Sequence, residues 1–170
     1  FRSDRLPYGF DGFRVVQISD LHGAEFGEGN EDLLSKVRLA APEAIFLTGD
    51  LVDKYRGIDW DYVEDTAEAL SAIAPTYYVT GNHEWAAGDV RQAKTVLEEC
   101  AITVISNEYV TLARKDAEIV LAGIDDPNGY ADQKTPEELA ADLYADRGDP
   151  FWILLAHRND RFAGQYSLLG

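Results

Sequence analysis

Ala44-Ile45-Phe46-Leu47-Thr48-Gly49-Asp50-Leu51-Val52-Asp53 joins an apolar run to an acidic loop, and the expected architecture of the whole chain follows from that join. The first five residues are apolar or β-branched and predict a buried strand. At Gly49 the chain changes abruptly to the polar pattern Gly-Asp-x-x-Asp. Because ligands in parallel α/β sheets bind beyond the carboxyl ends of the strands, Asp50 is expected in a functional site.

Three other apolar runs end in the same way, and they account for all three histidines of the chain. The clusters are Asp20-Leu21-His22-Gly23, Gly81-Asn82-His83-Glu84, and His157 directly after Ile153-Leu154-Leu155-Ala156. Since each cluster follows a predicted strand, all four are expected on one edge of a sheet. Residue types that bind metals, brought there from distant parts of the sequence, predict a metal site.

The predicted elements follow the order β-α-β-α-β-α and then a more meandering β segment. Helices are expected from Asn30, around Trp60, and after Asp89, which can cap its helix. A capping box at Thr135-Pro136-Glu137-Glu138 starts another helix. The predicted strands are 13–18, 44–48, 76–79, 103–105, 109–112, 119–122 and 151–155. This order predicts one domain over 1–170, with a largely parallel sheet covered by helices and a second or mixed sheet from the later strands.

The composition limits the possible functions. With 170 residues, 46% of them hydrophobic, the chain is long enough for one domain with a real core, and no apolar run approaches the ~18 residues of a membrane span. A single cysteine, Cys100, excludes an internal disulfide. The net charge of −16 argues against a nucleic-acid-binding surface and would repel an anionic substrate. A phosphate ester would therefore need a local cation, and bound metal is the natural candidate.

The residue types at the clusters suit divalent ions such as manganese, iron or zinc. Asp20 and His22 are two residues apart, so in an extended chain their side chains point the same way. The two oxygens of Asp50 can bridge two ions. Asn82 offers an oxygen and His157 a nitrogen, and the glycines before Asp50 and Asn82 allow tight turns.

In this order, Asp-x-His, Gly-Asp-x-x-Asp, Gly-Asn-His-Glu and a histidine after an apolar strand resemble the calcineurin-like metallophosphoesterase superfamily. The match runs from Asp20 to His157, and Gly123-Ile124-Asp125-Asp126 is similar to the bacterial phosphodiesterase-like branch. The resemblance implies an α/β fold, a four-layer α/β/β/α sandwich of two mixed sheets. It also implies two divalent metal ions and hydrolysis of a phosphate ester by a metal-bridged hydroxide.

The resemblance further implies how the ions are held. Asp20 and His22 would hold the first ion, and Asp50 would bridge the two. Asn82 and His157 would hold the second ion.

Three other residues receive roles that involve no metal bond. His83 would face the phosphate and stabilise or protonate the leaving oxygen. Asp53 and Glu84 would orient the ligands and His83. Asp125-Asp126 is expected first as part of a turn and second as a substrate contact.

The chain departs from the family pattern near its C-terminal end. The pattern closes with a Gly-His-x-His motif whose two histidines complete the ion sites, whereas this sequence stops at Ser167-Leu168-Leu169-Gly170. We therefore expect a C-terminally incomplete domain that lacks one ligand for each ion and its last strands. The family often has proline shortly after the position of His157, whereas Arg158-Asn159-Asp160 stands here.

Each motif alone has a simpler interpretation. Asp-x-His is commonly a loop feature, Gly-Asp-x-x-Asp a turn with a solvated acid, and Gly-Asn-His-Glu a turn with a helix cap. His157 alone fits a core histidine. All four would have to coincide at one sheet edge, which favours the site.

The expected activity is that of a phosphodiesterase on a small-molecule or lipid-linked phosphate ester. The alternatives are a phosphomonoesterase or pyrophosphohydrolase acting on a nucleotide or lipid-linked substrate, and a non-catalytic scaffold of the same fold. The Asn82-His83 pair argues against the scaffold, which has little reason to keep a histidine that binds no metal. We expect the protein in the cytoplasm or at the membrane periphery of a bacterium, with any tether outside this chain.

Overall fold

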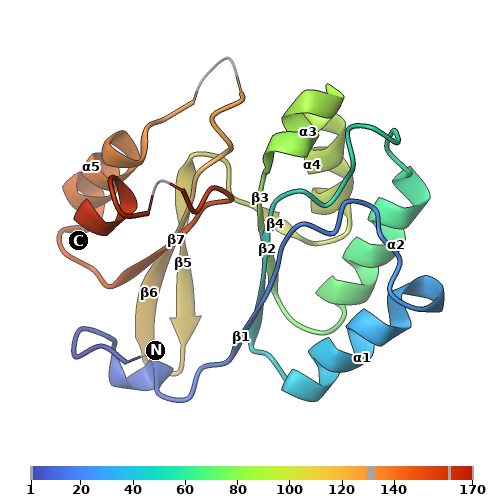
Figure 1. Cartoon of the computed structure of the whole chain (residues 1–170). Helices are drawn as coiled ribbons and strands as arrows, with labels where there is room; N and C mark the ends of the chain where they lie inside the picture. Colours follow the sequence, from blue (N-terminus) through green and yellow to red (C-terminus); the bar gives the residue numbers. More distant parts are fainter. Residues whose placement is uncertain (1, 130–132, 161, 170) are drawn as a thin grey trace.

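Two β-sheets face each other, and helices cover their outer faces (Figure 1). The computed structural model describes residues 2–129, 133–160 and 162–169, so Phe1 and Gly170 of the expected domain lie outside the described residues. Helices α1 to α4 lie beside the sheet with strand order β1-β2-β3-β4, and α5 lies beside the sheet with order β5-β6-β7. The four layers implied by the resemblance are therefore confirmed.

The first sheet is parallel along all four described strands. Its strands are β1 (Val15–Ile18), β2 (Ala44–Thr48), β3 (Thr76–Val79) and β4 (Thr103–Val104). The helices of this half are α1 (Glu31–Ala40), α2 (Trp60–Ser71), α3 (Asn82–Ala87) and α4 (Val90–Glu99). Because helical segments connect these strands, the sheet is parallel and not mixed, which corrects that detail of the expectation.

Two local expectations in this half are also corrected. Strand β4 belongs to the first sheet and not to the meandering β segment that follows it. Asp89 takes the N-cap position of α4 but makes no side-chain capping hydrogen bond.

The second sheet is mixed, as expected. Strands β5 (Glu108–Arg114) and β6 (Ala117–Gly123) form an antiparallel hairpin, and β7 (Trp152–Leu155) pairs in parallel with β6. Helix α5 (Pro136–Arg147) lies between β6 and β7 in the chain. The capping box is confirmed, because Thr135 Oγ1 accepts the N–H of Glu138 and Glu138 Oε2 accepts the N–H of Thr135. Short 3₁₀ helices occupy Tyr8–Phe10, Glu28–Asn30 and Tyr166–Leu168.

The alternation of side chains along the strands separates the core into layers. In β2, Ile45 and Leu47 pack under the helices of the first sheet, while Phe46 packs against the second sheet. In β6, Leu121 packs against the first sheet, while Val120 packs against α5. Both strands are thus apolar on both faces, which explains their continuous apolar sequences. Within the described residues, no helix is both long and apolar enough to cross a bilayer.

Candidate metal centre

The four polar clusters lie at the carboxyl ends of strands, but the strands do not all belong to one sheet. Asp20, Asp50 and Asn82 follow β1, β2 and β3, whereas His157 follows β7 in the second sheet. The prediction of a single sheet edge was therefore wrong for His157. Because the two sheets pack face to face, His157 Nε2 still lies 3.5 Å from Asp50 Oδ2.

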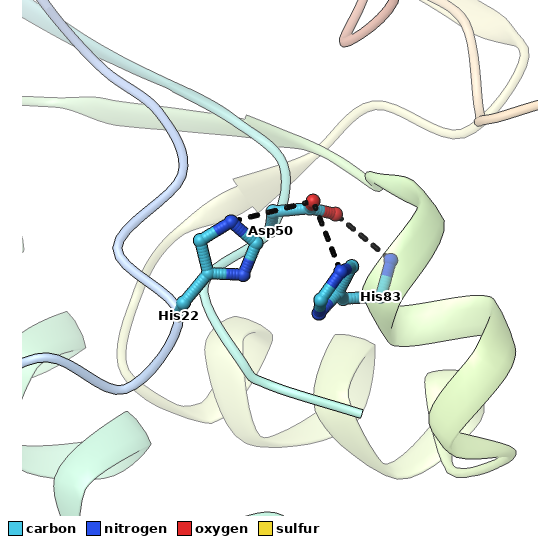
Figure 2. Close-up of side chains that lie close together, drawn as sticks. All are labelled: His22, Asp50 and His83. Carbon is cyan, nitrogen blue, oxygen red and sulfur yellow. Dashed lines mark hydrogen bonds and ion pairs between the residues drawn. The ribbon is translucent and has the colours of Figure 1, made fainter. Parts of the chain in front are cut away.

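Asp50 is the centre of the site. Its buried carboxylate oxygen Oδ2 lies 3.5 Å from Nε2 of His157, 3.8 Å from Nε2 of His22 and 4.0 Å from Nε2 of His83. Figure 2 shows His22 arriving from the loop after β1 and His83 from α3. Burial alone would raise the pKa of Asp50, but hydrogen bonds from His157 and from the His83 backbone N–H bring it below its usual value. Asp50 is therefore an ionised carboxylate at the meeting point of three imidazoles.

Asp20 and His22 do come together, although not as an extended segment. Strand β1 ends at Ile18, and φ is +58° at Asp20 and +51° at His22. The loop after β1 curls onto the loop after β2, because the N–H groups of Asp20 and His22 donate to the carbonyls of Gly49 and Asp50. This geometry places His22 Nε2 3.6 Å from Asp20 Oδ1. Left-handed backbone at non-glycine residues is costly, and such strain collects at functional sites.

The close approach of the loops after β2 and β3 requires glycine at 49 and 81. Gly49 has φ of +88°, and a Cβ there would lie 2.5 Å from the backbone nitrogen of Gly81. A Cβ at Gly81 would lie 2.5 Å from the backbone nitrogen of Asp50. The expectation that these glycines permit tight turns at the site is confirmed.

In their neutral forms His157 and His83 carry the ring hydrogen on different nitrogens, so their Nε2 atoms differ in hydrogen-bonding character. His157 Nδ1 lies 2.8 Å from the Thr48 carbonyl, which can only accept, so Nδ1 carries the hydrogen and Nε2 of the neutral ring has a free lone pair. His83 Nδ1 accepts the backbone N–H of Lys54 at 3.2 Å, so in the neutral ring Nε2 carries the hydrogen. Neutral His157 can therefore bind a metal through Nε2, which lies 3.3 Å from Asn82 Oδ1. Neutral His83 instead presents an N–H donor at Nε2.

Asp53 lies beside the His83 ring. Asp53 Oδ1 is 3.5 Å from His83 Nδ1 and also accepts the backbone N–H of Tyr55. When His83 gains a second proton, this carboxylate is placed to stabilise it.

Glu84 links the loop after β2 to the loop after β3 through backbone hydrogen bonds. Its buried carboxylate accepts backbone N–H groups from Asp50 at 3.0 Å and Gly81 at 2.7 Å through Oε2. Through Oε1 it accepts those of Leu51 at 2.7 Å and Val52 at 3.3 Å. Burial raises the pKa of Glu84, and the backbone N–H donors oppose that rise. Glu84 therefore fixes the position of the Asp50 loop relative to the start of α3.

Asp125 and Asp126 are more than turn residues, because both are buried beside the site. Asp125 accepts the Thr80 hydroxyl at 2.7 Å and the Lys94 ammonium at 2.7 Å. Asp126 accepts Nε and Nη2 of Arg158 at 2.6 and 3.1 Å. The pair thus anchors Thr80, which directly precedes Gly81-Asn82, and Arg158, which follows His157. Their sequence signal was two acids directly after a buried strand, the same form as Gly49-Asp50.

The donors fit a pair of metal ions. His22, Asp50 and His83 form one group, and Asp20, Asp50 and His157 form another, with one ligand atom of each residue within 4.8 Å of the others in its group. Nitrogen and oxygen ligands about 2.0–2.2 Å from a common ion lie about 3–4 Å apart, so small movements suffice. Asp50 belongs to both groups, as a bridging residue should. The first group includes His83 by distance, but the hydrogen on its Nε2 argues against coordination.

The metal-free protein should lose stability as the pH rises from about 6.5 to about 9. The neighbouring Asp50 carboxylate raises the pKa of His157 from its ordinary value of 6.5 to about 9. A raised folded-state pKa stabilises the protein fully below the unfolded value, and that stabilisation is lost as the pH passes the folded value. The loss is at most about 3.5 kcal/mol, at ~1.4 kcal/mol for each pKa unit. Urea unfolding in chelator at several pH values measures it, and His157→Asn should flatten the slope. Parallel profiles for the two proteins would contradict this assignment.

Comparison with known proteins shows which family the chain belongs to. Residues 13–168 match the family model described as calcineurin-like phosphoesterase. A Danio rerio relative named as a transmembrane protein with metallophosphoesterase domain is 30% identical over 131 residues, covering 72% of this chain and 29% of the relative. Phosphodiesterase YaeI of Escherichia coli (strain K12) is 25% identical over 118 residues, covering 67% of this chain and 44% of the relative. The chain spans less than half the length of these curated relatives.

The fold also has a counterpart among solved structures. The NAD nucleotidase NadN of Haemophilus influenzae aligns with a TM-score of 0.61 at 17% identity, covering 89% of this chain and 35% of that chain. At this identity the likeness concerns the fold alone. The family model, by contrast, spans every residue of the site, from Asp20 to His157, and the chain therefore belongs to the calcineurin-like phosphoesterase family.

Proposed function

We propose that this protein hydrolyses a phosphodiester with the help of two divalent metal ions. The observation that carries the proposal is the buried Asp50 carboxylate, which faces one histidine in ligand form and another in proton-donor form. Membership of the family supports phosphoester hydrolysis in general. The relative named as a phosphodiesterase supports the choice of a diester, on a small-molecule or lipid-linked substrate.

The ligand assignment is the one that the family resemblance implies. The Asp20–His22 and Asn82–His157 contacts support it, although grouping by distance alone puts Asp20 with His157. Asp20 and His22 would hold one ion, Asn82 and His157 the other, and Asp50 both. When bound, the ions supply a water that is deprotonated near neutral pH, and they offset the phosphate charge. That charge offset is needed because the chain itself carries a net charge of −16.

The proton donor in this proposal is His83. Its Nε2 faces Asp50, while its Nδ1, at the other end of the ring, accepts the Lys54 N–H and lies 3.5 Å from Asp53 Oδ1. In its doubly protonated form, with the Nδ1 hydrogen towards Asp53, His83 can deliver the Nε2 proton to the oxygen that leaves phosphorus, which returns the ring to its neutral form. That oxygen departs as an alcohol, and Asp53 steadies the ring during the transfer.

The test is to compare His83→Ala with wild type on two diesters, using the Mn²⁺-loaded full-length protein. A glycerophosphodiester has an alkyl leaving group that needs a proton, so kcat should fall by about 10²-fold or more. Bis(4-nitrophenyl) phosphate releases a phenolate that is stable without a proton, so its kcat should fall less. Phosphorus NMR and nitrophenol absorbance measure the two reactions.

Metal content is the control for this experiment. His83→Ala should keep its manganese, whereas loss of an ion would make His83 a ligand. Faster wild-type hydrolysis of 4-nitrophenyl phosphate or pyrophosphate than of either diester would favour the phosphomonoesterase or pyrophosphohydrolase. If none of these substrates shows metal-dependent turnover, the result would favour the alternative of a non-catalytic scaffold.

A further inference from the structure

A cavity of about 340 Å³ lies next to the metal ligand His22. It is bounded by the loop after β1, the loop after β2 and the first turn of α2. Apolar side chains of Val52, Ile58, Tyr62 and Val63 line it. Its volume is in the range of small-molecule binding sites, which begin at about 300 Å³.

The cavity adjoins His83 through two of its lining residues. The ring of His22 lies 4.4 Å from that of His83, measured between centroids. Asp53 lies 3.5 Å from His83 Nδ1. Since both line the cavity, the cavity lies beside the His83 ring.

The charges that line the cavity favour an uncharged occupant. Of the described lining residues, Asp53 and Asp59 are carboxylates and Arg56 alone carries a permanent positive charge. Arg56 is offset by Asp53, whose Oδ2 lies 3.5 Å from its Nε. Asp59 caps α2 by accepting the Tyr62 N–H at 3.1 Å, which uses part of its hydrogen-bonding capacity but leaves its charge. The net charge of the three is −1, which repels an anion.

We propose that this cavity receives the leaving group of the substrate and selects an uncharged aryl or alkyl alcohol. The inference rests on the proposed function, and it deepens that function by naming the chemical class of the alcohol that departs. A phosphate leaving group, as in pyrophosphate hydrolysis, is disfavoured by Asp53 and Asp59. The apolar wall supplies binding energy through burial of the departing group.

One wall of the cavity is anchored in the core, which allows the cavity to discriminate by size. Val52 and Val63 belong to the core under the first sheet, and the Tyr62 hydroxyl donates to the Ala24 carbonyl at 2.9 Å. Ile58 is only half-buried and packs at the edge of that core. A larger side chain at Ile58 therefore fills the cavity with little disturbance of the core.

The test compares Ile58→Trp with wild type in the full-length protein. The control is Leu39→Trp, the same enlargement at a side chain 87% exposed on α1. The first measurement is the binding of 2-naphthol, followed through the NMR signals of the Val63 methyls, with and without Mn²⁺. Ile58→Trp should weaken binding by about tenfold or more, and Leu39→Trp should leave it unchanged.

The second measurement is kcat/KM on methyl aryl phosphates. Ile58→Trp should lower kcat/KM about tenfold for a naphthyl leaving group and much less for a phenyl group. Asp59→Asn should raise kcat/KM for a substrate with a carboxyphenyl leaving group relative to kcat/KM for the substrate with the corresponding uncharged amide. Equal 2-naphthol binding by wild type and Ile58→Trp, or equal losses for both leaving groups, would overturn the proposal. Absent turnover in wild type would count against the proposed function alone, because 2-naphthol binding tests the cavity without turnover.

Discussion

Asp50→Asn is expected to lower the metal-dependent kcat/KM by about 10³-fold or more. A loss of this size corresponds to about 4 kcal/mol of transition-state stabilisation, in line with the several kcal/mol that metal ions contribute. The structure gives the reason, because Asp50 is the residue common to both groups of candidate ligands. An asparagine keeps the hydrogen bond from the His83 backbone N–H by placing its oxygen at Oδ1. Its amide nitrogen then replaces Oδ2, where it can donate to the Nε2 lone pair of neutral His157 and cannot bind an ion.

The matched control is Asp65→Asn, the same chemical change at an exposed position of α2. Kinetics on bis(4-nitrophenyl) phosphate, together with calorimetric Mn²⁺ titration, separates loss of metal from loss of fold. Asp50→Asn should bind Mn²⁺ weakly while retaining the circular dichroism of wild type. A variant that binds two ions as tightly as wild type would refute the bridging role.

Glu84→Gln is expected to destabilise the protein by about 2–6 kcal/mol, although the two side chains have nearly the same shape. Each carboxylate oxygen accepts two backbone N–H groups. Whichever way the glutamine amide turns, its NH₂ group faces two N–H donors, which lose their acceptor inside the protein. A buried donor without an acceptor costs about 1–3 kcal/mol, and two are created.

The control for this change is Glu98→Gln on the exposed face of α4, which should alter stability by less than about 0.5 kcal/mol. Urea unfolding of the metal-free proteins measures both. Equal stabilities for Glu84→Gln and wild type would show that the Asp50 loop does not depend on this carboxylate. Glu84→Asp is a useful companion, since it keeps the charge but is too short to reach all four donors.

Much of the first sheet was predictable because its signals are local. The strands at 44–48 and 76–79 were predicted with the boundaries observed, since a parallel strand buried on both faces is a continuous apolar run. The capping box at Thr135 likewise involves residues three apart in the sequence. Helix α3 was considered only as a turn with a helix cap, because its six residues are too few to show a helical period.

The candidate site was predictable in its membership but not in its geometry. A polar cluster after each apolar strand identified Asp20, His22, Asp50, Asn82 and His157, because strand ends meet where ligands bind. The left-handed backbone at Asp20 and His22 was not foreseen, since it depends on hydrogen bonds to the loop after β2. The ion pair between Asp126 and Arg158 was missed for a similar reason, as its members lie 32 residues apart.

Periodicity and motif order, which short-range sterics and alternating burial impose, were sufficient for the boundaries of the strands at 44–48 and 76–79, for the capping box at Thr135 and for a list of candidate ligand residues. Three features required the folded chain: the arrival of His157 from the second sheet, the opposite hydrogen-bonding states of His83 and His157, and the cavity beside His22. Each depends on segments far apart in the sequence that meet only when the two sheets pack. A residue pattern constrains its neighbours along the chain, whereas distances between loops depend on how the whole core closes.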